Sequence, residues 1–393
     1  MQNILIIGNG FDLYHKLPTR YTDFLCMVKN WGEFYSKIVS TENADEDGVS
    51  CEQFAVRVDK AGRLIADTLN DFAMKSNCYD LDKLKELDTI IKSNIWIKYF
   101  VQIQYNKDSW IDFESEIENV LKNIELFYTE EIFKCEDKTV EESINPLCFK
   151  IISFLMENTK SLPKGPFFYN KNTIELLVYG NSKKNLLDEL KSDLDDLIIA
   201  LDIYLEQFIS KIKVDCYSKQ IKELGMINLL NFNYTYIFKT IYGGRNLNEI
   251  HQIHGSLQER DIVLGISDEC FDELDYVYFQ KYFQRIQKRT GAFYRAWISD
   301  EHSAFDDEPV NLYILGHSLG ATDKGVLDEF FKNYDGIKHI TIFYYNQTAY
   351  EELVIALIKL YGKKFVIEQT GNGRIEFVKL EQAITGEAKN EYN

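Results

Sequence analysis

The chain has 393 residues, 45% of them hydrophobic, which is enough for roughly two or three domains that bury their own cores without disulfides or a structural metal. Its 62 acidic side chains outnumber its 44 Lys and Arg side chains, and the formal charge is −18. This balance disfavours non-specific nucleic-acid binding and docking on anionic lipid, so an anionic ligand must be held by local groups.

Neither the cysteines nor the N-terminus predicts a secreted or membrane protein. The seven cysteines are scattered and form no C-x-x-C pair, which favours reduced thiols and gives no zinc spacing. The N-terminal MQNILIIGNGFD has no basic region, and no apolar run reaches the roughly 18 residues that a membrane span needs. We therefore expect a cytoplasmic protein without a metal ion.

The first predicted element is a buried strand at residues 3–7 (NILII), which is followed at once by glycines. Residues 21–221 then favour helices. The clearest helix has apolar residues at alternating steps of three and four, typical of a packing face in a helical bundle or of a dimer interface. That stripe consists of Leu187, Leu190, Leu194, Leu197, Leu201, Tyr204 and Phe208. Loops are predicted at the acidic run from Glu42 to Asp47 and around Pro163, Gly165 and Pro166.

Strand patterns return after residue 222. The predicted strands are 226–232, 249–254, 261–265, 310–316, 339–345 and 363–367, with helices at 323–332 and 348–361. Alternating strands and helices predict a parallel sheet covered on both faces. We therefore expect an α/β domain formed by residues 1–20 and 222–385, with an all-helical insertion at residues 21–221.

The first candidate motif is Gly8-Asn9-Gly10-Phe11-Asp12, directly after the first strand. Glycines at this point let backbone N–H groups approach a phosphate, and Asp12 could accept a hydrogen bond from a ribose hydroxyl. The third glycine of the dinucleotide fingerprint is absent, and a structural turn accounts for two glycines about equally well. The position of the motif at the end of the first strand favours ligand binding.

Asn233 and His254 follow two later strands. Asn233 could orient a water or a ribose hydroxyl, although a strand-end turn or a helix cap uses asparagine in the same way. His254 precedes a glycine and could act as a general base, or it could be a hydrogen-bonded structural histidine. His251 and His254 cannot both face one metal from a strand, so we predict no metal site.

The segment Gly316-His317-Ser318-Leu319-Gly320 has the G-x-S-x-G form of a hydrolase nucleophile elbow. That interpretation needs an acid and then a histidine further along the chain. The only later histidine is His339, which leaves too few residues for the elbow, its helix and the remaining triad. A glycine-serine loop that contacts ribose or phosphate is the better interpretation.

Taken together, the motifs resemble the bacteriophage abortive-infection AbiH family. The resemblance is carried, in chain order, by GNGFDL, LPTRYTDF (17–24), WIDFE (110–114), NFNYT (231–235), IHG (253–255) and ILGHSLGATD (314–323). It covers nearly the whole chain, and the set of motifs is more specific than any one of them. Membership implies a role in bacterial defence against phage.

The same order of motifs is similar to a sirtuin-like NAD-binding domain, which implies a Rossmann-like parallel sheet. In that comparison Asn233 and His254 match the catalytic asparagine and histidine. The residues expected to contact the nucleotide are Gly8, Asn9, Gly10, Asp12, Gly316, His317, Ser318 and Asp323. Two residues depart from the pattern, because Asn9 replaces an alanine and Thr235 replaces an aspartate. The four-cysteine zinc module of protein deacetylases is also missing, which argues against an acyl-lysine substrate.

The resemblance implies hydrolysis of NAD to nicotinamide and ADP-ribose, with NAD or a related adenine nucleotide as the ligand. It also implies a restrained enzyme, so we expect homo-oligomers through the helical insertion or a phage-derived trigger. Two alternatives stay open. One is a nucleotide-binding sensor without turnover, and the other is a nucleic-acid-directed toxin, which the charge of −18 disfavours.

Overall fold

The computed structural model describes residues 2–42, 79–104, 112–128, 145–162, 182–243, 246–298, 310–332 and 336–386. They form two compact units. Residues 1–20, 205–263 and 285–393 make up the α/β unit, and residues 21–204 and 264–284 make up the helical unit. The expected loops at 43–47 and 163–166 lie outside the described residues.

A six-stranded sheet forms the centre of the α/β unit, and all its described strands are parallel. Its order is β4-β3-β1-β5-β6-β7, so the chain adds strands first on one side of β1 and then on the other. The strands are β1 (Gln2–Ile7), β3 (Ile227–Asn231), β4 (Leu247–Gln252), β5 (Val310–Leu315), β6 (Ile337–Tyr344) and β7 (Ile375–Lys379). Burial on both faces explains why these segments are short, continuous apolar runs.

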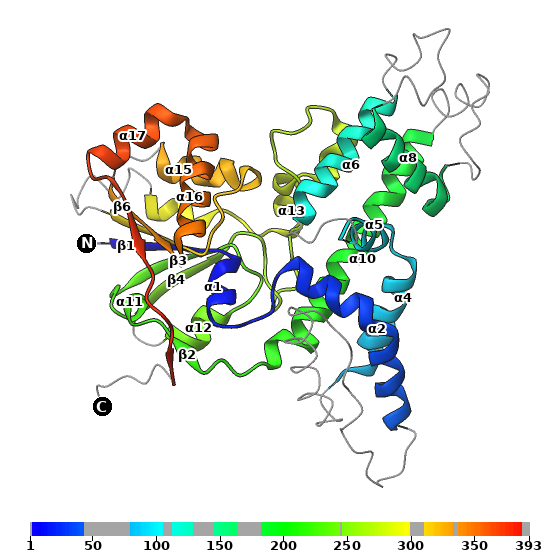
Figure 1. The fold of residues 1–393 in the computed structure, drawn as a ribbon, viewed down its shortest axis with the longest axis horizontal. Helices are drawn as coiled ribbons and strands as arrows, with labels where there is room; N and C mark the ends of the chain where they lie inside the picture. Colours follow the sequence, from blue (N-terminus) through cyan, green and yellow to red (C-terminus); the bar gives the residue numbers. More distant parts are fainter. Residues whose placement is uncertain are drawn as a thin grey trace. The chain divides into compact units, whose positions relative to one another are not determined.

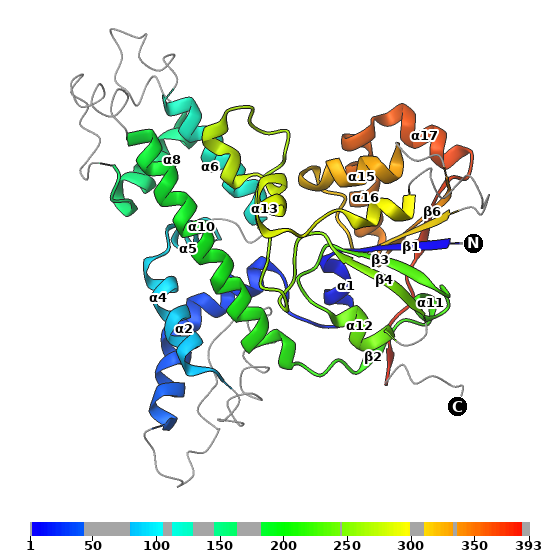
Figure 2. The same ribbon diagram turned by 180° about the vertical axis from the view of Figure 1, so that it is seen from behind.

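Helices cover both faces of this sheet, as Figure 1 and Figure 2 show. Alternate residues of β1 point to opposite faces: Ile4 and Ile6 pack with α15, α16 and α17, while Leu5 and Ile7 pack with α1, α11 and α12. The helices are α1 (Asn9–Tyr14), α11 (Lys219–Lys222), α12 (Ile237–Tyr242), α15 (Lys324–Phe331), α16 (Gln347–Tyr361) and α17 (Lys363–Gly371). Three short 3₁₀ turns accompany them at Ile209–Lys211, Phe293–Ile298 and Ala321–Asp323.

Two predicted strands are wrong. Residues 261–265 are buried but form no strand, because Val263 donates to the carbonyl of His254 (2.8 Å) instead of joining the ladder. Residues 363–367 begin α17, which starts after Gly362 at a φ of +83°. A short apolar run fits a strand and a half-buried helix equally well. The edge strand β7 was not predicted.

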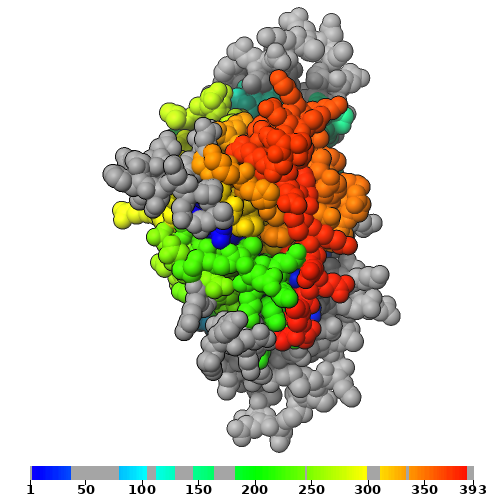
Figure 3. All heavy atoms as spheres, turned by 90° about the vertical axis from the view of Figure 1, so that its left-hand side faces the viewer, coloured from blue at the N-terminus to red at the C-terminus, as the bar shows by residue number. Residues whose placement is uncertain are grey.

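The C-terminal stretch crosses the outside of the α/β unit. After β7, β8 (Ile384–Thr385) pairs antiparallel with β2 (Cys216–Tyr217). Figure 3 shows this red stretch running beside the green residues of the same unit. On the way, the hydroxyl of Tyr14 in α1 donates to the carbonyl of Glu381 (2.9 Å). Residues 205–221, which the sequence assigned to the insertion, belong to the α/β unit.

The described helices of the helical unit are α2 (Tyr21–Glu42), α4 (Leu81–Ser93), α5 (Ile95–Gln104), α6 (Phe113–Tyr128), α8 (Pro146–Asn158) and α10 (Ser182–Gln207), together with the later η5 (Leu274–Phe279) and α13 (Lys281–Lys288). The predicted leucine stripe of α10 is buried throughout, so it is a packing face. No described helix is both long and apolar enough to cross a membrane.

Residues 264–284 join the helical unit through polar contacts with α6. The side chain of Lys281 is 1% exposed, and its Nζ lies 2.8 Å from Glu114 Oε2. The hydroxyl of Tyr276 donates to Glu125 Oε2 (2.6 Å). Such long-range pairs leave no periodic signal, which is why the sequence did not assign this segment to the helical unit.

Candidate functional site

The candidate motifs meet at the carboxyl edge of the sheet. Gly8 follows β1, Phe232 follows β3, Ile253 follows β4 and Gly316 follows β5. The strands are parallel, so all four loops leave the same edge. The direction in which strands are added reverses between β1 and β5, and ligands of open α/β sheets bind at such a switch point.

Glycines let the first and last of these loops touch backbone to backbone. A Cβ on Gly8 would lie 2.7 Å from His317 Cα, and one on Gly316 would lie 2.2 Å from Phe11 N. Gly316 also has a φ of +67°, which disfavours any other residue. The N–H groups of Gly8 and Gly10 donate to the carbonyls of Leu315 (3.2 Å) and Gly316 (2.8 Å). Those two N–H groups therefore hold the loops together in this structure, and phosphate binding by this loop stays a prediction.

Asn233 is held in one orientation by two acceptors. Its Nδ2 donates to the carbonyl of Gly8 (3.0 Å) and to Asp12 Oδ1 (3.1 Å). Its backbone N–H donates to Asn231 Oδ1 (2.8 Å), and Asn231 Nδ2 donates to the carbonyl of Thr235 (2.9 Å). The first asparagine of the motif thus shapes the loop, while the second turns its amide oxygen away from both acceptors.

Asp12 lies beneath this amide. Its side chain is 1% exposed, and its second oxygen accepts from the hydroxyl of Thr235 (2.7 Å). Burial raises the pKa of Asp12 to about 7, although the hydrogen bonds from Thr235 and Asn233 work in the opposite direction. Because both carboxylate oxygens already accept hydrogen bonds, direct contact with a ribose hydroxyl stays a prediction.

His254 and His317 share one carboxylate. His254 Nε2 lies 3.0 Å from Asp323 Oδ1, and His317 Nε2 lies 3.4 Å from Asp323 Oδ2. His317 Nδ1 accepts the backbone N–H of Leu319 (2.9 Å), so its proton is on Nε2 and points at Asp323. The ring of Phe232, next to Asn233 in the chain, packs against both imidazoles, with centroids 5.2 Å and 4.3 Å away. The structure therefore brings Asn233, His254, His317 and Asp323 to one edge.

Asn9 and Ser318 are the exposed members of the predicted set. Asn9 Oδ1 accepts from the hydroxyl of Thr19 (2.5 Å). In the G-x-S-x-G segment the left-handed residues are Gly316 and Leu319, the latter with a φ of +54°, whereas an elbow strains its serine. His339 lies at the start of β6 and pairs with Glu376 (3.3 Å). No described histidine forms a triad with Ser318, so the geometry does not favour the hydrolase interpretation.

Sequence reasoning missed Thr235, Phe232 and Tyr345 as parts of this edge. Thr235 was noted only as a departure from a motif, yet it is one of the two donors to Asp12. Tyr345 follows β6, and its hydroxyl donates to the carbonyl of Gly10 (2.5 Å). A tyrosine at a strand end was the only available signal for it. Among the described residues, no group of three His, Cys, Asp or Glu side chains is arranged to hold a metal ion.

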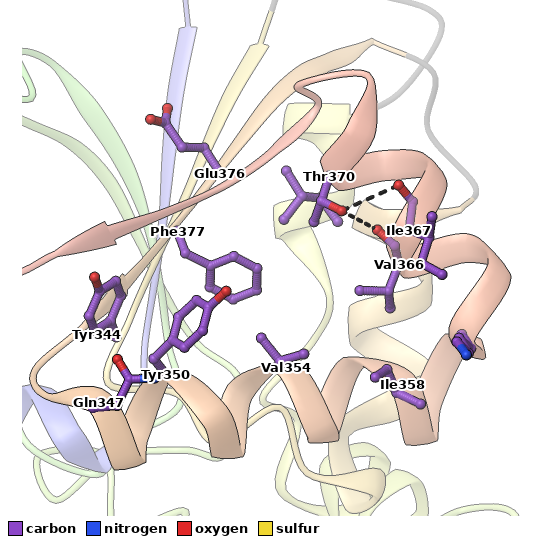
Figure 4. A pocket seen from close by; sticks show the side chains of 12 residues that line it. Tyr344, Gln347, Tyr350, Val354, Ile358, Val366, Ile367, Thr370, Glu376 and Phe377 are labelled. Carbon is purple, nitrogen blue, oxygen red and sulfur yellow. Dashed lines mark hydrogen bonds between the residues drawn. The ribbon is translucent and has the colours of Figure 1, made fainter.

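A groove of about 670 Å³ lies elsewhere in the α/β unit, between α16, α17 and β7 (Figure 4). None of the predicted site residues lines it. Aromatic and aliphatic side chains dominate its wall, and the hydroxyl of Thr370 bonds only to carbonyls of its own helix. Its lining residues are Tyr344, Gln347, Tyr350, Val354, Ile358, Lys363, Val366, Ile367, Thr370, Ile375, Glu376 and Phe377.

Comparison with known proteins gives one result. The family model described as "Bacteriophage abortive infection AbiH" matches residues 4–345, which include all four loops of the carboxyl edge and end just before α16. No curated protein and no solved structure matches the chain.

Proposed function

Because the chain belongs to the bacteriophage abortive infection AbiH family, we propose that it is a phage-defence effector whose α/β unit hydrolyses NAD to nicotinamide and ADP-ribose. The observation that carries the proposal is that Asn233 and His254 both lie at the carboxyl edge of the sheet, where Asn233 is hydrogen-bonded to Asp12 of α1 and His254 to Asp323 before α15. Numbered along the chain, the sheet has the order 3-2-1-4-5-6, which is that of dinucleotide-binding Rossmann folds. The similarity of the motifs to sirtuin-like enzymes supplies the choice of NAD.

Asn233 is proposed to orient the attacking water or the ribose. Cleavage of the bond between nicotinamide and ribose passes through an oxocarbenium-like state, as in glycoside hydrolysis. Both hydrogens of the Asn233 amide are donated to Gly8 and Asp12, so its Oδ1 is the atom that can accept a hydrogen bond from a ligand. Holding that oxygen in advance lowers the entropic cost of reaching the reactive geometry.

His254 is proposed to accept a proton through the ribose hydroxyls. In the neutral ring, Asp323 accepts the Nε2 hydrogen, which leaves Nδ1 as the basic nitrogen. His317 Nε2 lies 3.4 Å from the other oxygen of the same carboxylate, so the two imidazoles flank Asp323. Ser318 and Asn9, exposed at this edge, are proposed to contact the nucleotide with their side chains.

The helical unit is the proposed place of restraint, because unchecked NAD hydrolysis would kill the host. A phage-derived trigger or a change of assembly would release the enzyme. The proposed location in the bacterial cell is the cytoplasm, where NAD is available.

The test is nicotinamide release from NAD by the purified protein, followed by chromatography. Asn233→Ala and His254→Ala should each lower the rate by at least about 100-fold, because Asn233 sets the geometry of attack and His254 is a positioned proton acceptor. His339→Ala, at the opposite end of β6, is the matched control and should keep full activity. Full activity in the first two variants would overturn the assignment.

If the purified wild type releases no nicotinamide, two explanations remain: a restrained enzyme or a nucleotide-binding sensor. Phage infection of cells that carry the wild-type chain or His254→Ala separates them. The restrained enzyme should deplete NAD only with the wild type, whereas unchanged NAD in both strains would leave the sensor.

A further inference from the structure

The buried carboxylate of Asp12 has no counter-charge. Its two partners, Asn233 and Thr235, are neutral donors, and among the described residues no cation is paired with it. An ionised carboxylate withdrawn from water without a cation costs several kcal/mol of stability in general. A fold keeps such a group where its charge serves a function, so the position calls for a functional explanation.

Helix capping and loop geometry do not account for an acid at this position. The N-cap of α1 is Gly8, and the side chain of Asp12 reaches residues 221 and 223 positions away instead of its own helix. An asparagine could make both bonds, because its oxygen would accept from Asn233 and its amide would donate to the hydroxyl of Thr235. The negative charge itself is what aspartate adds.

That charge is hydrogen-bonded to the Asn233 amide, which is proposed to contact the ligand. We propose that Asp12 is a positioning residue that gives the site a buried negative charge and so selects a nucleotide with a positive charge beside its ribose. A pyridinium nucleotide has such a charge, whereas its reduced dihydropyridine form has the same shape and a neutral ring. This inference rests on the proposed function, since it names the form of the substrate that the same site prefers.

Titration of Asp12 makes the proposal measurable. The titratable groups next to it are Tyr345 after β6, which interacts electrostatically with Asp12, and Tyr14 and His15, which follow it along α1. Burial raises the pKa of both tyrosines, and burial lowers the pKa of His15 to about 4. None of these three changes charge between about pH 6 and about pH 8.5, while Asp12, with a pKa of about 7, does. His254, His317 and Asp323 are packed around Phe232, and a comparison of variants that differ only at Asp12 removes their effect.

The experiment measures the dissociation constants of NAD⁺ and NADH by calorimetry at about pH 6 and about pH 8.5. Because turnover must be prevented, His254→Ala is the reference and His254→Ala/Asp12→Asn is the test. In the reference, the preference for NAD⁺ over NADH should grow by on the order of tenfold as the pH rises. In the test protein that ratio should not change with pH.

His254→Ala/Thr235→Val is the matched second variant, because it removes one hydrogen bond to Asp12 and keeps the carboxyl group. It should retain a preference that grows with pH, and thermal melting confirms that each variant is folded. The inference would be overturned if the preference for NAD⁺ over NADH grew with pH equally in the Asp12→Asn protein. It would also be overturned if that preference grew with pH in neither protein, and in both cases the proposed function would stand. Charge-selective binding without nicotinamide release by the wild type, before or after infection, would refute hydrolysis and leave the inference intact. Failure to bind either nucleotide would overturn both.

Discussion

The carboxyl edge of the sheet and the groove between α16 and α17 lie in the same unit but are built by opposite means. At the edge, Gly8, Gly10 and Gly316 bring backbones into direct contact, and Asp12 is buried against neutral donors. In the groove, apolar side chains such as Ile358 and Ile367 line an open surface, and Ile367 is 60% exposed. The edge carries strain and a desolvated carboxylate, whereas the groove carries neither.

This difference teaches where to look for function. Features that cost stability, such as backbone strain or a buried carboxylate, persist only when function retains them. They therefore indicate a functional site more strongly than the volume of a groove does. The AbiH match agrees with this physical argument, because it covers residues 4–345 and stops before the helices of the groove. The following predictions test the contrast, beginning with the largest expected effect.

Gly316→Ala should disrupt the backbone contact between the loops that follow β1 and β5. The new Cβ would lie 2.2 Å from Phe11 N and 2.5 Å from Gly10 C, at a φ of +67°. We expect a loss of more than about 4 kcal/mol in the free energy of unfolding, or failure to fold. The matched control is Gly362→Ala beside the groove, where φ is +83° but no atom lies within 4 Å of the added carbon. It should cost only about 1 to 2 kcal/mol, measured by urea unfolding. Equal losses would remove the contrast between the regions.

Asp12→Asn should be more stable than the wild type, and the difference should grow as the pH rises. The folded-state pKa of Asp12, about 7, exceeds its ordinary value of 3.8, so its favourable contribution is complete below pH 3.8 and is lost as the pH rises through 7. Removing the charge should raise the free energy of unfolding by about 4 kcal/mol at pH 8.5, with almost no difference near pH 4. Urea unfolding at both pH values measures this. A variant that is less stable at pH 8.5 would contradict an uncompensated charge.

Protonation of His15 should lower the free energy of unfolding at acidic pH. Its ring is 2% exposed and is held by the carbonyl of Phe11 (2.8 Å) and the hydroxyl of Tyr242 (2.9 Å). Burial lowers its pKa from 6.5 to about 4, so stability is complete above pH 6.5 and is lost as the pH falls towards 4. His15 should account for about 2 kcal/mol of the loss between pH 7 and pH 5.

The readout for His15 is the pH slope and not the absolute stability, because His15→Gln also loses hydrogen bonds. His15→Gln should flatten the decline in the free energy of unfolding between pH 7 and pH 5. The matched control is His339→Gln in β6, where the side chain is 39% exposed, and its stability should decline with pH as that of the wild type does. A His15→Gln protein with the wild-type slope would count against the buried neutral histidine.

The sequence predicted the location of the edge but not its bonding. Strand ends followed by Gly8, Asn233, His254 and Gly316 could be recognised because apolar runs and glycines are local signals. The bonds from Asn233 and Thr235 to Asp12 span 221 and 223 residues, and no local pattern encodes them. Residues 363–367 show the same limit, since only packing decides whether Val366 belongs to a strand or a helix.

The groove should tolerate substitution at its exposed wall. Ile367→Ser changes a side chain that is 60% exposed on α17, so the free energy of unfolding should move by less than about 0.5 kcal/mol. Its neighbour Val366 is 6% exposed and is the matched control, because Val366→Ser buries a hydroxyl in the core and should cost about 2 kcal/mol. Nicotinamide release and protection against phage should both survive Ile367→Ser. If that variant folded but lost phage protection, the groove would be a functional site. The absence of strain in a region would then be no argument against function there.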